Sequence, residues 1–193
     1  MRLPCATHLV MVFELEEDAK RVLRVLPSRL GRFGLMIHPD KTRLMDFRGH
    51  KKGGNNPAMD HDSSFDFLGF THYWGKSERG KFVVRRKTTR KRYSRGLKAI
   101  GVWCRANRHM AVIEQHEQLS AKLRGHYSYY GITGNFLSLK RFKNEAERIW
   151  RKWLNRRTRA RAMPWERFVR LLQFLPLPPV RLVHSVYVAR TLS

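Results

Sequence analysis

The sequence has few acidic residues, and the deficit lies mainly in one part of the chain. Residues 1–75 contain 11 Lys and Arg against 9 Asp and Glu, a net charge of +2, whereas residues 76–193 contain 29 against 6, a net charge of +23. Such a chain repels itself unless a polyanion is present, and nucleic acid is the usual polyanion. The charge distribution therefore favours nucleic-acid binding by the part of the chain after about residue 75.

Other absences exclude further classes of protein. The two cysteines, Cys5 and Cys104, are far apart, so they cannot form a structural zinc site alone and indicate a reduced compartment. No apolar stretch approaches the roughly 20 residues that cross a bilayer, and the first residues lack the apolar run of a secretory signal. No Gly-rich phosphate loop and no Ser/His/Asp arrangement is recognisable. We therefore expect a cytoplasmic protein without a membrane partner.

The apolar content is nevertheless high enough for a folded core. Hydrophobic residues make up 42% of the 193 residues and include five Trp, which is not the composition of a disordered basic tail. The length allows one large domain or two small ones.

The pattern up to about residue 87 predicts a small α/β piece. An amphipathic helix is expected over residues 16–33, with acids in its first turn and a kink or break at Pro27. The Gly- and Asn-rich residues 48–64 predict a loop. The expected strands are Leu9–Phe13, Leu35–Ile37, Thr42–Phe47, Phe65–Trp74 and Lys81–Arg86, of which the last two form a β-hairpin.

From Thr88 the apolar period becomes helical, which predicts a bundle of three or four helices. Pro164 suits the first turn of the last helix, and the apolar part of the tail after Pro176 has no clear assignment. The three main apolar stripes are Tyr93, Leu97, Ile100 and Cys104; then Val112, His116, Leu119, Leu123 and Tyr127; then Leu139, Phe142, Ala146, Ile149, Trp150, Trp153 and Leu154.

Five segments, in this order and spacing, carry a family resemblance. They are Leu9-Val-Met-Val-Phe-Glu14, Gly34-Leu-Met-Ile-His-Pro-Asp-Lys-Thr-Arg43, Phe65-Asp-Phe-Leu-Gly-Phe70, Leu123-Arg-Gly-His-Tyr-Ser-Tyr-Tyr-Gly-Ile-Thr-Gly-Asn135 and Trp153-Leu-Asn-Arg-Arg157. Over nearly its whole length the chain resembles the C-terminal part of a group II intron reverse transcriptase/maturase, the protein of a bacterial mobile genetic element.

The resemblance implies an α+β fold in two parts. Residues 1–87 would be a partial polymerase palm, with a few strands, one helix and a β-hairpin similar to the primer grip at Phe67, Leu68, Gly69 and Phe70. Residues 88–175 would be the all-α thumb, or maturase-specific X domain, and residues 176–193 a tail.

The resemblance also indicates what is missing. The family's Tyr-Ala-Asp-Asp turn would align with Cys5, Ala6, Thr7 and His8, so Thr7 and His8 stand at the aspartate positions. Neither side chain supplies the anionic oxygen that Mg²⁺ of a polymerase requires, and the family's fingers and third carboxylate are absent. We expect no polymerase activity from this chain, no catalytic residue and no cofactor. No metal site is expected either, because Asp60-His61-Asp62 reads as a solvated loop.

Basic and aromatic residues are the candidates for nucleic-acid contact. Basic runs are often only solvated faces, but so few acids are available here that phosphate contact is favoured. Tyr127 is expected in the core, with its neighbours Arg124, His126 and Tyr129 nearer the surface, where a ring can stack on an unpaired base. The candidates are Arg85, Arg86, Lys87, Arg90, Lys91, Arg92, Arg95, Lys98, Arg124, His126, Tyr129, Arg151, Lys152, Arg156, Arg157, Arg159 and Arg161.

Three functional hypotheses remain open. The resemblance implies an RNA-binding maturase fragment that assists folding and splicing of its intron RNA, with the ribozyme performing the chemistry. A remnant of a degraded retroelement without independent function is the second. A general basic protein that also accepts DNA is the third. Oligomeric state is left open.

Overall fold

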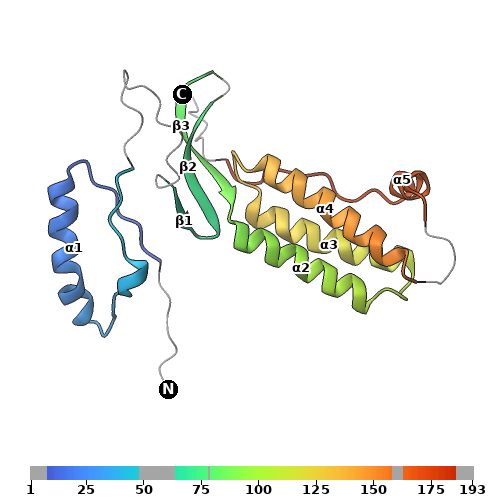
Figure 1. The fold of residues 1–193 in the computed structure, drawn as a ribbon, viewed down its shortest axis with the longest axis horizontal. Helices are drawn as coiled ribbons and strands as arrows, with labels where there is room; N and C mark the ends of the chain where they lie inside the picture. Colours follow the sequence, from blue (N-terminus) through green and yellow to red (C-terminus); the bar gives the residue numbers. More distant parts are fainter. Residues whose placement is uncertain (1–7, 48–63, 78, 158–162, 186–193) are drawn as a thin grey trace, which may run out of the picture. The chain divides into compact units, whose positions relative to one another are not determined.

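The protein is an α+β molecule with an N-terminal helix, a small antiparallel sheet and four helices packed together (Figure 1). The computed structural model describes residues 8–47, 64–77, 79–157 and 163–185. The helices are α1 (Glu16–Gly31), α2 (Arg90–Ala106), α3 (Val112–Tyr130), α4 (Phe136–Leu154) and α5 (Trp165–Phe174); the strands are β1 (Phe65–Phe67), β2 (Phe70–Lys76) and β3 (Phe82–Thr88); and η1 (Pro39–Lys41) is a 3-10 turn.

The chain divides into two compact units. The first, which we call the N-terminal unit, comprises residues 1–68 and 73–83. The second, which we call the helical unit, comprises residues 69–72 and 84–193. The division runs through the sheet, so that Phe70–His72 of β2 and Val84–Thr88 of β3 belong to the helical unit.

In the N-terminal unit, the predicted helix is confirmed as α1. Three acids occupy its first turn, where the positive end of the helix dipole favours them. Pro27 lies inside the helix, which continues for another turn to Gly31, so the expected break does not occur. Of the residues of α1, only Ala19 is buried.

The strands predicted at Leu9–Phe13, Leu35–Ile37 and Thr42–Phe47 were wrong. Within the described residues these segments belong to no strand, although the turn expected between the last two is present as η1. Several of their apolar side chains are exposed, for example Val12 at 91% and Met36 at 95%, whereas Phe47 packs against Phe65 of β1 and Trp74 of β2. Apolar alternation predicts a strand only where a partner supplies the ladder hydrogen bonds.

The expected hairpin is present, but a turn divides its first strand. Leu68 and Gly69 separate β1 from β2, and both have positive φ, 48° and 83° respectively. Two such residues form the hairpin turns whose twist matches that of the flanking strands. The result is a three-stranded sheet in the order β1-β2-β3. The predicted loop at residues 48–64, with Asp60-His61-Asp62, lies outside the described residues except for Ser64, which belongs to no helix or strand.

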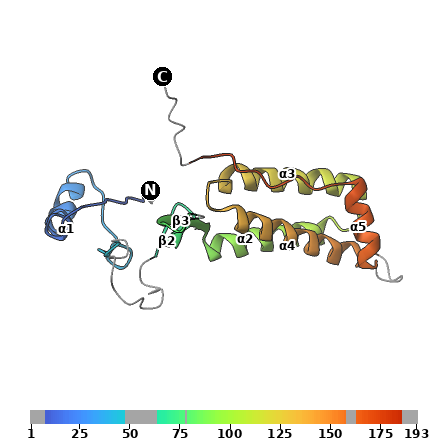
Figure 2. The same ribbon diagram turned by 90° about the horizontal axis from the view of Figure 1, so that it is seen from above.

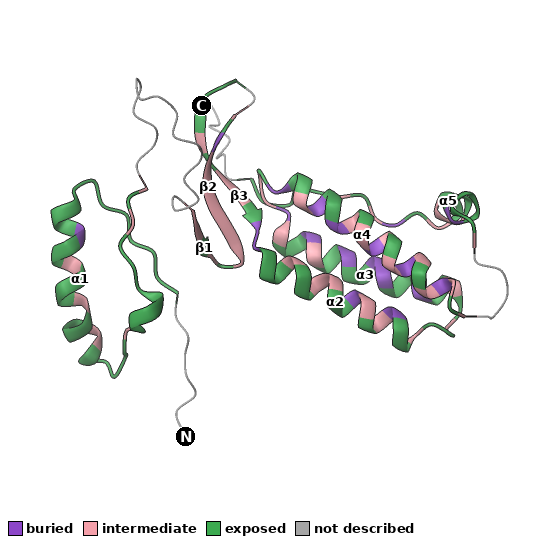
Figure 3. Ribbon diagram, in the orientation of Figure 1, coloured by how far each residue is buried: buried purple, intermediate pink, exposed green. Residues whose placement is uncertain are grey.

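In the helical unit, the three predicted stripes form the core. Figure 3 shows their buried residues on facing sides of α2, α3 and α4. Trp150 and Phe142 are the largest fully buried side chains from α4. Gly96 of α2 lets α4 approach, since a Cβ there would lie 2.9 Å from a ring carbon of Phe142. The buried core consists of Ile100, Cys104, Leu119, Leu123, Tyr127, Leu139, Phe142, Ala146, Trp150, Leu154, Phe168 and Leu177.

Two buried amides connect the elements of this core. The Asn135 side chain accepts a hydrogen bond from the Thr88 backbone N–H and donates to Thr88 Oγ1 and to the Tyr130 carbonyl, each at 2.8 Å. Gln115 accepts a hydrogen bond from Trp150 Nε1 at 2.9 Å and donates to the carbonyl of Asn107 at 2.8 Å. Because every one of these polar groups is satisfied, the amides fix the ends of β3, α2 and α3 at little desolvation cost.

The C-terminal segment packs along α3. Figure 2 shows α5 across the end of the other helices and the chain after it returning beside α3. A His116 ring nitrogen lies 3.0 Å from the Pro176 carbonyl, and the N–H groups of Val183 and His184 donate to the carbonyl of Gly131. Leu177 is buried. The described part of the tail, residues 176–185, thus covers part of α3. Pro164, predicted in the first turn of α5, immediately precedes that helix.

Candidate nucleic-acid interface

Helix α2 carries cations without any acid. The Thr89 hydroxyl caps its start by accepting from the Arg92 N–H, and the helix contains six Lys and Arg and no Asp or Glu. Its buried face is formed by Ile100 and Cys104, with Tyr93 and Leu97 partly buried beside them. The opposite face follows from the helical period of 3.6 residues and is exposed throughout. It carries Lys91, Arg95, Lys98 and Arg105, which we call the α2 row.

In the part of the chain that the structure describes, no carboxylate forms an ion pair with any of the four side chains of the α2 row. Exposed cations on one helix face repel one another, and this repulsion falls when phosphates replace the missing acids. A shallow groove beside the row is lined by Arg95, Lys98 and Asn107 together with apolar side chains, among them Val102 and Trp103.

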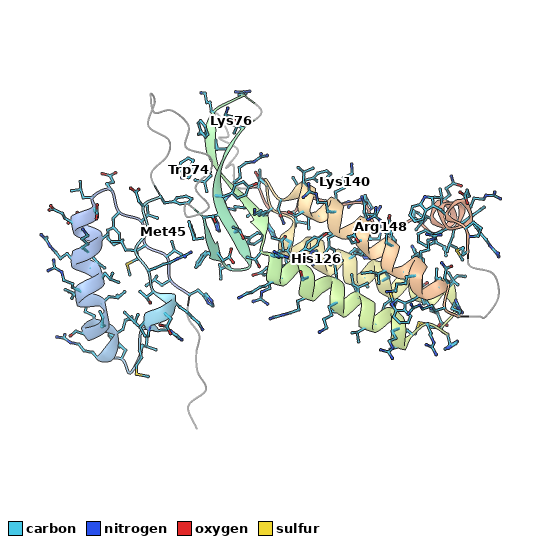
Figure 4. The ribbon with its side chains drawn as sticks, in the orientation of Figure 1. Met45, Trp74, Lys76, His126, Lys140 and Arg148 are labelled. Carbon is cyan, nitrogen blue, oxygen red and sulfur yellow. The ribbon has the colours of Figure 1, made fainter. Side chains whose placement is uncertain are left out.

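Helix α4 presents a second cationic face. Lys140, Arg141, Arg148 and Lys152 are exposed, and Figure 4 labels the first and third of them on the helix. The helix has six cations and two acids, and both acids are paired within it: Glu145 with Arg148 at 2.8 Å, and Glu147 with Lys143 at 3.4 Å. The unpaired cations therefore outnumber the acids on this face.

Helix α3 differs from both. It has two Lys and Arg and two Glu, and the C-terminal segment covers part of it. Arg124 and Tyr129 are exposed and Tyr127 is buried, as predicted. The positive charge of the bundle is therefore concentrated on α2 and α4.

His126 does not lie at the surface as expected. Its ring stacks on Phe142, with 3.8 Å between ring centroids and an interplanar angle of 4°, and it also contacts Tyr130. Its Nε2 atom is buried without a hydrogen-bond partner. Burial lowers the pKa of His126 to about 4, so the ring is neutral at pH 7 and is not a phosphate-binding cation. The helical stripe predicted for α3 did not include position 126, although Phe142 lies close enough to cover it.

Within the helical unit, Gly69 and Phe70 pack on aromatic side chains of α3. The Gly69 carbonyl accepts from the Thr89 N–H at 2.9 Å, and a Cβ at Gly69 would lie 3.4 Å from the Tyr130 hydroxyl. Phe70 stacks nearly parallel to Tyr129, with centroids 6.2 Å apart. Close packing against Tyr130 thus accounts for the glycine of the hairpin that resembles a primer grip. The predicted primer-grip residues Phe67 and Leu68 are half-buried and exposed respectively.

The remaining predicted candidates are spread over several elements. Arg85 and Arg86 of β3 are half-buried and Lys87 is exposed. Arg90 and Arg92 are exposed at the start of α2. At and beyond the end of α4, Lys152 and Arg156 are exposed, whereas Arg151 and Arg157 are half-buried. Thr7, Arg159 and Arg161 lie outside the described residues, and His8 is exposed.

The described residues hold no group of three or more His, Cys, Asp or Glu side chains that could bind a metal ion. Cys104 is buried, which raises the pKa of its thiol to about 12, so the thiol is protonated and unreactive at pH 7. In the parts of the chain that the structure describes, no helix combines the length and apolarity needed to cross a membrane.

Sequence reasoning missed four exposed cations of the two faces: Arg105, Lys140, Arg141 and Arg148. It followed runs of adjacent basic residues, which a helix distributes over all of its sides. Adding seven residues, or two helical turns, to the positions of Lys91 and Lys98 leads along the same face to Arg105. That spacing was the available signal.

A scan against models of protein families, a search of curated proteins and a search of solved structures each find no match to the chain.

Proposed function

We propose that this chain binds structured RNA through the exposed faces of α2 and α4. The observation that carries the proposal is the α2 row, four exposed cations on a helix without an acid. Phosphates that contact the row would release condensed counterions, which provides most of the binding free energy in such complexes. The proposal assigns no role in this contact to α1, whose first turn is acidic.

RNA is favoured over duplex DNA by the aromatic residues beside the cations. Tyr129 is 56% exposed on α3, and Arg92 lies close to Gly69 and Tyr130. A tyrosine ring can stack on a base only where that base is unpaired, and folded RNA offers such bases in loops and bulges. Replacing Tyr129 by Ala is therefore expected to weaken binding to a bulged RNA more than to a plain duplex.

The motifs set out above further suggest which RNA is bound. On their resemblance to a maturase, we propose that the ligand is a group II intron, whose active fold the protein would stabilise by binding it preferentially. The protein would perform no chemistry, because Thr7 and His8 stand where the family has aspartates. The purified chain with a primed RNA template and Mg²⁺ or Mn²⁺ should give no extension product. Any extension would contradict this part of the proposal.

Salt dependence provides the test of the interface. The logarithm of the association constant for intron RNA should fall with the logarithm of salt concentration with a slope of at least about −4, since each phosphate contact contributes roughly −0.7 to −0.9. Replacing Lys91, Arg95 and Lys98 together by Ala should flatten that slope by about 2.

The matched control removes the same charge from the N-terminal unit. Arg21, Arg24 and Arg29 of α1 are all exposed, and their replacement by Ala should leave affinity and slope nearly unchanged. If both triple variants weaken binding equally, net charge rather than the α2 row is responsible. If intron RNA, unrelated RNA and duplex DNA bind equally well to the folded protein, a general basic nucleic-acid-binding protein replaces the maturase proposal.

A further inference from the structure

The C-terminal end of α4 contains a hollow in which cations are held by aromatic side chains. Its lining consists of Arg148, Arg151, Lys152, Asn155 and Arg156. We propose that this hollow, which we call the α4 clamp, is a preorganised site for internal backbone phosphates of the bound nucleic acid. The inference rests on the proposed function, since it names how one part of that interface would bind.

Arg151 is fixed from two sides. Its guanidinium carbon lies 5.0 Å from the centroid of the Trp165 ring, and its Nη2 donates to the Met163 carbonyl at 3.0 Å. The Met163 N–H in turn donates to Asn155 Oδ1 at 2.9 Å, so a lining residue of the clamp also fixes the segment before α5. An arginine held in this way loses little rotamer freedom when it binds a ligand.

Arg156 is held in a similar way. Its guanidinium carbon lies 5.1 Å from the centroid of the Trp153 ring, yet the side chain is exposed. Arg148 is bound by Glu145 at 2.8 Å, whereas Lys152 is exposed and, within the described residues, forms no ion pair. From position 148 to position 156 the chain advances by about 12 Å at helical rise, so the clamp can contact more than one phosphate.

The negative end of the α4 dipole offers a simpler explanation for this concentration of cations, because cations near a helix C-terminus are stabilised. Lysine would satisfy the dipole as well as arginine. Only arginine offers a planar group that stacks on a ring while its edge binds a phosphate through two parallel hydrogen bonds. Stacking on tryptophan therefore favours a phosphate site over a dipole effect alone.

Arg24 of α1 provides the contrast. It is exposed, and within the described residues its side chain forms no hydrogen bond, ion pair or ring contact. Such a side chain contributes only its charge, and lysine supplies the same charge. Replacement of arginine by lysine should therefore affect the clamp and leave this position unchanged.

The test compares Arg156→Lys with Arg24→Lys in the full chain, using an RNA hairpin with an internal bulge at fixed salt. Arg156→Lys should lower affinity by roughly tenfold, because a two-bond contact is lost while the charge remains. Arg24→Lys, in the helix to which the proposal assigns no contact, should bind within about twofold of the original protein. The slope of affinity against salt should be the same in both variants, since neither changes the number of charges. Arg148→Lys provides a second measurement at the clamp, and thermal unfolding shows whether each variant is folded.

Each outcome bears on one claim. If Arg156→Lys and Arg148→Lys both fold and bind like the original protein, the clamp is overturned and the proposed function stands. If the original protein shows no salt-dependent RNA binding, both fail. Hairpins ending in a 5′ hydroxyl and in a 5′ phosphate should lose equal affinity on Arg156→Lys. A loss restricted to the phosphorylated hairpin would assign the hollow to a terminal phosphate and contradict internal contacts.

Discussion

Both units of the molecule contain apolar residues at helical spacing, but they bury these residues to very different extents. Of the buried apolar residues among those described, Ala19 alone belongs to the N-terminal unit, and the others lie in the helical unit. Figure 3 shows the same difference, because α1 is exposed along most of its length whereas α2, α3 and α4 have buried sides. Helix formation alone therefore does not predict where the stability of this chain resides.

The difference shows what an amphipathic pattern requires. Helix α1 buries only Ala19, and its apolar side chains Leu23 and Val25 are 36% and 47% exposed. Most helical stability in proteins comes from packing of the apolar face rather than from propensity. A small aromatic group packs together in the N-terminal unit, where Phe47 contacts Phe65 and Trp74 at centroid distances of 5.1 and 5.5 Å.

The largest expected effect is a difference in local stability between the units. Backbone amides of α1 should exchange hydrogen through local opening at low free energy, whereas amides in the middle of α3 and α4 should require opening of the whole bundle, which for a domain costs several kcal/mol. Native-state hydrogen exchange followed by mass spectrometry measures both. Equal protection from exchange in α1 and α4 would contradict the expected difference in local stability between the two units.

A pair of matched truncations sharpens the same comparison. Trp150→Ala should destabilise the helical unit by about 3–5 kcal/mol, because the fully buried indole leaves a cavity and Gln115 loses a hydrogen bond. Leu26→Ala in α1 should cost less than about 1 kcal/mol, since Leu26 is only half-buried. Urea unfolding followed by circular dichroism gives both values. A large effect of Leu26→Ala would show that α1 packs against something in solution.

Prediction from the sequence succeeded for the core of the helical unit and failed for the strands expected in the N-terminal unit. The stripes of α2, α3 and α4 were predicted residue by residue, because each apolar face meets another helix and burial enforces the period. The three N-terminal strands were wrong because a strand depends on partners that the local pattern does not reveal. The turn at Leu68 was missed because leucine seldom adopts positive φ.

The candidate interface was predictable in its charge but not in its geometry. The excess of cations after residue 75 follows from counting residues. The α2 row is found only when the residues of α2 are assigned to faces of the helix. His126 was expected nearer the surface than Tyr127 because it lies outside the apolar stripe through Tyr127, although its ring stacks on Phe142, sixteen positions later. The aromatic contacts of Arg151 and Arg156 depend on tertiary packing and on rotamers that no spacing shows.

A smaller effect is expected from two glycines that both lie in helices of the helical unit. Gly96→Ala should destabilise the bundle by about 1–3 kcal/mol, because the new Cβ would lie 2.9 Å from the Phe142 ring. Gly125→Ala meets no atom within 4 Å and should stabilise α3 by about 0.5–1 kcal/mol through the lower entropy of the unfolded chain. Thermal unfolding of the two variants should therefore shift in opposite directions. Two shifts of the same sign would contradict the close approach of α2 and α4.

The smallest expected effect is a pH dependence of the stability of the helical unit that arises from His126. Burial holds the pKa of His126 near 4 in the folded helical unit, below the ordinary value of 6.5 that the unfolded chain would have. The unfolded state therefore binds more protons between these two values, so the stability from the neutral, stacked ring is complete above pH 6.5 and is lost as pH falls towards 4. Lowering the pH from 7 to 5 should lower the free energy of unfolding measured in urea.

The variant His126→Phe keeps an aromatic ring against Phe142 but removes the titratable imidazole. Its free energy of unfolding should therefore fall less over the same pH interval. Carboxylates that titrate in this interval affect both proteins alike and cancel in the difference. Equal losses in the two proteins would show that the ring is solvated, and would return His126 to the exposed surface that the sequence predicted for it.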